Sequence, residues 1–193
     1  MKRLSIALIL SAAAASPAFA HVNPAEHGSF AAGFSHPLLG ADHVLAMLGV
    51  GLWAFLVGGR AVWAIPSAFV GTMMLGFGAA LAGIGLPFVE PTIAASVVVI
   101  GLLALVAAQV PVVVGIVVVG FFALFHGYAH GGEMGEATSL SFMSGFALAT
   151  ALLHAVGIGI GLAGNALSRR GRIAARIAGG LTALGGLWLV AGA

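Results

Sequence analysis

Six long apolar stretches occupy most of the chain, and they constrain its fold more than any other feature. They cover residues 34–58, 62–84, 91–108, 111–129, 138–164 and 173–192. Most reach the roughly 20 residues that a helix needs to cross the hydrocarbon of a bilayer, and two are near the lower limit. Only 6% of the residues are charged, too few to cover the surface of a soluble protein. We therefore expect the chain to lie in a membrane.

Runs rich in Val, Ile and Phe, such as Ile93–Ile100, could form buried strands in water. A bilayer allows only helices or closed barrels, because every backbone polar group must find a partner within the protein. The chain lacks the alternating pattern of a membrane barrel. We predict an all-α integral membrane bundle of six transmembrane helices that forms a single domain over residues 21–193. The short connections predict that sequential helices are antiparallel neighbours.

The first twenty residues have the features of a cleaved signal peptide. Lys2 and Arg3 precede an apolar core over residues 4–10, and Ala18-Phe19-Ala20 matches a cleavage signal. Cleavage after Ala20 would make His21 the new N-terminus and place it outside the cytoplasm. The imidazole and free amine of His21 could then chelate a metal ion together.

The basic residues predict the orientation of the bundle. With the N-terminus outside, Arg60 and the cluster over residues 169–176 face the cytoplasm, as the positive-inside rule requires. Glu90, Glu133 and Glu136 then lie outside. We predict a multi-pass protein of the bacterial inner membrane with a periplasmic N-terminus. The partners we expect are the lipid bilayer and a metal ion, without nucleic acid, and the chain could also form a homo-oligomer.

Two histidine clusters interrupt this apolar sequence. The first is His36-Pro37-Leu38-Leu39-Gly40-Ala41-Asp42-His43, and the second is His126-Gly127-Tyr128-Ala129-His130-Gly131-Gly132-Glu133. Polar side chains at membrane depth are costly, so by default they indicate function. Imidazole and carboxylate groups are ligands for divalent transition metals. The predicted topology places both clusters near the outer ends of the first and fourth helices, where they could converge on one site.

The second cluster has a spacing typical of helical metal ligands. His126 and His130 are four residues apart, which puts both imidazoles on one helix face. Glu133 follows a Gly-Gly pair that is expected to end the helix, and it could bind the ion or attract cations to the site. His154, in the fifth stretch, is either a deeper ligand or a hydrogen-bonded residue of the bundle. Met47 and Met73 are more typical of core packing than of metal binding.

The first cluster has a geometric difficulty. On one continuous helix, His36 and His43 would be about 10.5 Å apart along the axis, too far to share an ion. Pro37 and Gly40 favour an irregular helix, so the two imidazoles could meet if the helix is broken near Gly40. Asp42 and His43 would point about 100° apart on a helix. One of them could bind the ion while the other orients its neighbour or faces a partner.

These motifs resemble the HupE/UreJ family of nickel and cobalt permeases over nearly the whole chain. The resemblance rests on the leader followed by histidine, on the two histidine motifs, and on Ala149-Thr150-x-Leu152-Leu153-His154 with Gly157. It implies a small membrane carrier for Ni²⁺ or Co²⁺ that supplies hydrogenase or urease maturation. The positions it implies as functional are His36, Asp42, His43, His126, His130 and Glu133. Tyr128 and Gly135 depart from the family pattern, in which histidine and proline are common there.

We therefore expect a transition-metal permease, not an enzyme, with Ni²⁺ or Co²⁺ as cargo and no prosthetic group. Zn²⁺ and Cu²⁺ would bind the same donors. One alternative is an intramembrane metalloenzyme with histidine ligands, although the chain lacks an H-E-x-x-H motif and Ser144-Gly145 lacks a nucleophile context. Another is an electron-transfer bundle in which His43 and His126 are the axial ligands of a haem.

Overall fold

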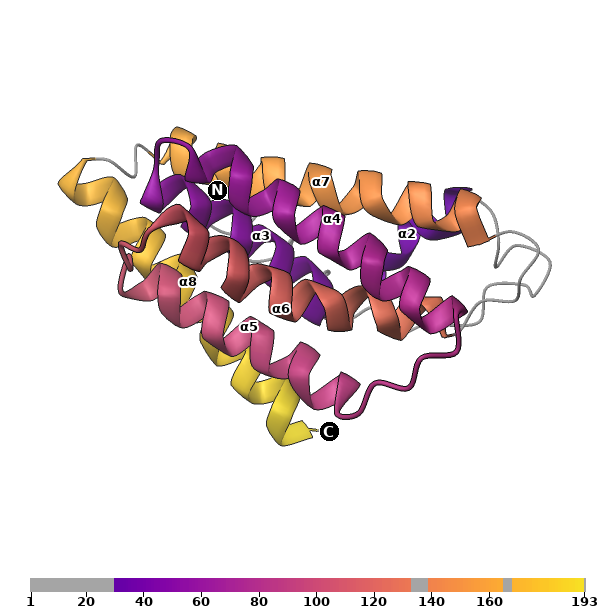
Figure 1. Ribbon diagram of the computed structural model, residues 1–193. Helices are drawn as coiled ribbons and strands as arrows, with labels where there is room; N and C mark the ends of the chain where they lie inside the picture. Colours follow the sequence, from indigo (N-terminus) through magenta and orange to yellow (C-terminus); the bar gives the residue numbers. More distant parts are fainter. Residues whose placement is uncertain (1–29, 133–138, 165–167, 193) are drawn as a thin grey trace, which may run out of the picture.

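The chain folds into α-helices throughout the part that the structure describes, as the sequence predicts. The structure is a computed structural model and describes residues 30–132, 139–164 and 168–192. Within these ranges it has seven helices and no strands (Figure 1): α2 (Phe30–Leu39), α3 (Ala41–Val57), α4 (Ala61–Leu81), α5 (Val89–Leu105), α6 (Val112–Gly131), α7 (Ser139–Ala163) and α8 (Arg169–Gly192). The expected leader, His21 and Glu133 lie outside the described residues.

Several of these helices suit a bilayer. Four of them, α4, α6, α7 and α8, are long and apolar enough to cross a membrane, and the bent pair of α2 and α3 can provide a fifth span. Helix α5 is also apolar but has only 17 residues. Large apolar side chains such as Leu75 and Trp188 are exposed on the surface, where lipid can cover them. The chain is a multi-pass membrane protein, and the sixth span stays a prediction.

The first apolar stretch is broken at Gly40, as the separation of His36 and His43 required. Helix α2 ends at Leu39, Gly40 has an extended backbone (φ −92°, ψ 119°), and α3 begins at Ala41. The two helices meet at an angle of 85°. A Cβ atom on Gly40 would lie 2.7 Å from Asp42 Oδ1 and 3.1 Å from His43 Nδ1. Glycine at this position therefore leaves room for the side chains of Asp42 and His43.

The most extensive helix packing joins helices that are not consecutive in the chain. Helix α4 packs along α6, α5 along α8, and α7 against both α2 and α3 (Figure 1). The expectation that sequential helices are neighbours holds only in part, because α3 packs against α4 and α5 against α6, but less extensively than the pairs above. Small residues explain the difference, because they let two helices approach closely only where both present a suitable face. A Cβ atom on Gly127 would overlap the backbone of Met73, and one on Gly157 would overlap the backbone of Leu48.

Candidate metal site

Four imidazoles from three helices lie in contact inside the bundle. They belong to His36 on α2, His43 on α3, and His126 and His130 on α6. The ring centroids are 4.4 Å apart for His36 and His130, 4.7 Å for His43 and His130, and 4.9 Å for His43 and His126. The two sequence clusters thus converge as predicted, and we call these four residues the histidine cluster.

The histidine cluster is largely shielded from solvent by aromatic side chains. His126 is fully buried, and His43 and His130 are each 6% exposed. Phe146 on α7 contacts three of the four imidazoles, most closely His130 at a centroid distance of 4.8 Å. Burying several polar rings in an apolar environment is costly unless hydrogen bonds or a ligand compensate. The cluster is therefore hard to explain by packing alone.

His43 and His130 face each other with their ring nitrogens. The two Nε2 atoms are 2.7 Å apart, although the residues are 87 positions apart in the sequence. Two neighbouring nitrogen ligands of one ion, each about 2.1 Å from it, are separated by about 3 Å when they subtend a right angle. The pair is already close to that separation. A divalent cation that replaced the proton between the two nitrogens would lie beside the line that joins them, so both rings would turn towards it.

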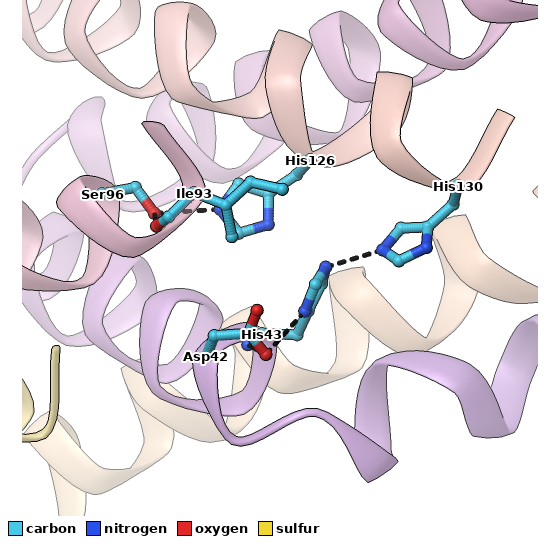
Figure 2. A network of polar contacts seen from close by, with 6 residues as sticks. All are labelled: Asp42, His43, Ile93, Ser96, His126 and His130. Carbon is cyan, nitrogen blue, oxygen red and sulfur yellow. Dashed lines mark hydrogen bonds and ion pairs between the residues drawn. The ribbon is translucent and has the colours of Figure 1, made fainter. Parts of the chain in front are cut away.

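Asp42 holds His43 in this orientation (Figure 2). His43 Nδ1 lies 2.9 Å from Asp42 Oδ1, and the backbone N–H of His43 also donates to that oxygen, at 2.9 Å. A carboxylate can only accept a hydrogen bond, so Nδ1 keeps its proton and donates to Asp42, and His43 Nε2 is left with a lone pair that faces His130. Of the alternatives open for Asp42, the geometry supports orientation of its neighbour.

Ser96 on α5 orients His126 in a comparable way, and the sequence did not reveal it (Figure 2). Ser96 Oγ lies 2.6 Å from the carbonyl oxygen of Ile93 and 2.9 Å from His126 Nε2. The single hydroxyl proton must go to the carbonyl, which cannot donate, so His126 Nε2–H donates to Ser96 Oγ. His126 Nδ1 is then unprotonated, and it is buried with no hydrogen-bond partner. This nitrogen is available to a ligand.

His154 and Tyr128, which the sequence also singled out, have other positions. His154 on α7 is separate from the histidine cluster, and the Phe69 ring contacts it at 5.0 Å and His126 at 5.5 Å. Tyr128 accepts a hydrogen bond from the backbone of Leu86, at 3.2 Å, and so is tied to the connection between α4 and α5. Among the described residues, no group of three His, Asp or Glu side chains is arranged to hold a metal ion. A bound ion would therefore need some rearrangement, or ligands from outside these residues.

Comparison with known proteins gives a consistent result. The sequence pattern of the family described as HupE / UreJ protein matches residues 8–189. The chain is 44% identical to Protein HupE from Rhizobium leguminosarum bv. viciae over 183 residues, which cover 94% of this chain and 95% of that protein. No solved structure matches it. Since the family match spans almost the whole chain, including both histidine motifs, the chain belongs to the HupE/UreJ family.

Proposed function

We propose that this protein is a permease that carries Ni²⁺ or Co²⁺ into the cytoplasm, with the histidine cluster as its outer binding site. The observation that carries the proposal is the 2.7 Å separation of the Nε2 atoms of His43 and His130. Membership of the HupE/UreJ family, which is implicated in nickel and cobalt uptake, supports the same function. The cargo would supply metal enzymes such as hydrogenase or urease.

The donors explain which ions the site would accept. Imidazole nitrogens favour Ni²⁺, Co²⁺, Cu²⁺ and Zn²⁺, whereas Mg²⁺ and Ca²⁺ prefer sites built from oxygen. The cation exchanges water for His43, His126 and His130, and His36 lies within reach on the broken first segment. A permease also needs moderate affinity, because an ion that is held too tightly does not leave.

We infer transport and not haem-based electron transfer. The rings of His43 and His126 are in edge contact, with centroids 4.9 Å apart. Two axial haem ligands would have to lie on opposite faces of a porphyrin, for which this contact leaves no space. We expect the purified protein to be colourless, whereas a Soret band would contradict this inference.

Metal accumulation in cells tests the proposed function. We expect His43→Ala and His126→Ala to lower Ni²⁺ uptake by about tenfold or more at equal expression, because each removes an imidazole from the site. Phe121→Ala is a matched control, since Phe121 lies on α6 with His126 but is 56% exposed on the surface. Undiminished uptake by both histidine variants would contradict the role that we assign to the histidine cluster.

The preferred ion can be identified with purified protein. A ligand that binds the folded state raises its thermal stability in proportion to the logarithm of its concentration relative to Kd. We expect Ni²⁺ and Co²⁺ to raise the Tm and to enter liposomes that contain the protein, and Mg²⁺ to do neither. If none of Ni²⁺, Co²⁺, Zn²⁺ and Cu²⁺ bound to the protein or entered the liposomes, this result would contradict the proposed function as a whole.

A further inference from the structure

A series of ring contacts leads from the histidine cluster to a second polar group. His43 contacts His126 at a centroid distance of 4.9 Å, His126 contacts Phe69 at 5.5 Å, and Phe69 contacts His154 at 5.0 Å. The last step crosses from α4 to α7, since Phe69 belongs to α4 and His154 to α7. His154 is thus adjacent to the candidate metal site but not part of it.

His154 has an unusual environment for a buried histidine. It is 1% exposed, and neither Nδ1 nor Nε2 has a hydrogen-bond partner. In native proteins, the large majority of buried side-chain polar atoms are hydrogen-bonded to protein or to ordered water. A neutral imidazole also has a lone pair on one of its nitrogens. His154 therefore offers an unused nitrogen ligand inside the bundle.

Two more potential donors lie one helical turn away. Thr150 precedes His154 by four residues on α7, and Met73 follows Phe69 by four residues on α4, so each pair shares a helix face. Thr150 is fully buried, and its hydroxyl lies 3.6 Å from the sulfur atom of Met73, which is 1% exposed. The α4–α7 interface thus brings together an imidazole, a hydroxyl and a thioether in two adjacent layers.

We propose that His154, Thr150 and Met73 form a second, inner binding site for the transported ion, which the ion reaches from His126. Thr150 and Met73 form its outer layer, next to the Gly127 turn of α6, and His154 lies one helical turn further inward, beside the Phe69 ring. This inference rests on the proposed function, because it needs a cation that arrives from the histidine cluster. Nitrogen and sulfur donors select transition metals over Mg²⁺ and Ca²⁺. With only one imidazole, the inner site binds weakly, and weak binding at successive sites allows an ion to move on.

The variant His154→Phe tests the inner site, because it keeps an aromatic ring against Phe69 and removes both nitrogen atoms. We expect the Ni²⁺ flux into proteoliposomes at saturating metal to fall by roughly tenfold, as for loss of a ligand contact. The KM for Ni²⁺, and the affinity of the detergent-solubilised protein, should stay within about twofold of the wild-type values because the histidine cluster is intact. Wild-type flux would overturn the proposal, and so would a parallel loss of Ni²⁺ affinity, which would indicate a structural role.

A second variant tests the other donors and covers the case in which His154→Phe fails to fold. Met73→Leu combined with Thr150→Val removes the sulfur and the hydroxyl while nearly preserving side-chain volume. Met74→Leu is the matched control, since Met74 is adjacent in the sequence but 39% exposed. We expect a lower saturating flux only in the double variant, and equal flux in both would overturn the donor set. If the wild-type protein moves neither Ni²⁺ nor Co²⁺, the proposed function fails; if it does and the variants match it, only the inner site fails.

Discussion

Two hydrogen-bond acceptors decide which histidine nitrogens can meet an ion. Asp42 accepts from His43 Nδ1, which leaves Nε2 for the pair with His130. Ser96 accepts from His126 Nε2, which leaves Nδ1 unpartnered. Metal-binding histidines usually donate their second nitrogen to such an acceptor, which fixes the tautomer and the ring orientation. The same arrangement here means that both rings are oriented before any ion arrives.

Removing the hydroxyl of Ser96 should weaken metal binding without touching a ligand. We expect Ser96→Ala to lower Ni²⁺ affinity by about 10- to 100-fold, because His126 then loses the acceptor that fixes its tautomer. Titration of the purified protein measures the affinity, and ¹⁵N shifts of labelled histidine report the tautomer. Ser144→Ala is the control, since Ser144 makes the same bond to a carbonyl three residues earlier but is exposed. Equal affinity in the two variants would exclude this role for Ser96.

The sequence predicted the histidines of the site better than the residues that orient them. His43, His126 and His130 were predicted from their spacing and their cost at membrane depth, and they converge in the structure. Ser96 was not predicted, because its partner is 30 positions away on another helix. The available signal was a single hydroxyl within the apolar run of residues 93–100. Such a signal shows that a polar partner is needed but not which residue provides it.

The break between α2 and α3 is the element that brings His36 to the other three imidazoles of the histidine cluster. The structure turns the first segment by 85° at Gly40, and the His36 and His130 rings lie 4.4 Å apart. The sequence predicted this break by a distance argument, since a continuous helix would keep His36 and His43 too far apart. It could not predict the angle, which depends on how α2 packs against α7.

A side chain at position 40 should disturb the site and leave the rest of the bundle intact. The backbone angles of Gly40 are open to alanine, but the added Cβ would crowd Asp42 Oδ1 and His43 Nδ1. We therefore expect Gly40→Ala to reduce Ni²⁺ uptake strongly at equal expression. Gly71→Ala is the control, because a Cβ there meets nothing within 4 Å. Normal uptake by Gly40→Ala would show that the orientation of His43 by Asp42 is not needed.

Close packing of α4 against α6 requires glycine on the face of α4 that meets α6, and not on its other faces. A Cβ atom on Gly76 would overlap the backbone of Leu124, whereas one on Gly78 would meet nothing within 4 Å. We expect Gly76→Ala to destabilise the protein by about 1–3 kcal/mol, as overpacking does. Gly78→Ala should leave the Tm unchanged or raise it, because alanine favours a helix. Thermal unfolding in detergent checks both, and equal Tm values would contradict the packing of these two helices.

At the level of the whole molecule, the sequence predicted the number of apolar segments and not their partners. Each of the six stretches overlaps a helix, and the first overlaps two. The main helix pairs are α4 with α6, α5 with α8 and α3 with α7, none of them consecutive. Loop length limits where a helix can begin, but the helix it packs against is selected by the faces on which glycine allows close approach. Those faces belong to pairs of helices, so they cannot be identified from one segment alone.

Helix α5 decides the topology, because it is the shortest of the described helices outside the bent pair of α2 and α3. Its 17 residues rise about 25 Å, slightly less than the roughly 30 Å of a typical hydrocarbon core. Three helices, α5, α6 and α7, lie between Gly85 and Arg170. If α6 and α7 both cross the membrane, these two positions are on opposite sides only if α5 crosses it as well. If α5 dips into the bilayer and returns, both positions are on the same side.

Single cysteines can show whether α5 crosses the membrane. The sequence has no cysteine, so each introduced thiol is a unique site for a label. We expect Gly85→Cys to react with a membrane-impermeant maleimide applied from outside, and Arg170→Cys to react only after the membrane is permeabilised. Both positions are exposed, and a Cβ at position 85 meets nothing within 4 Å. Ni²⁺ uptake by each variant confirms that it folds. Labelling of both from the same side would mean that α5 does not span the membrane, and the positive-inside orientation would then hold for only part of the chain.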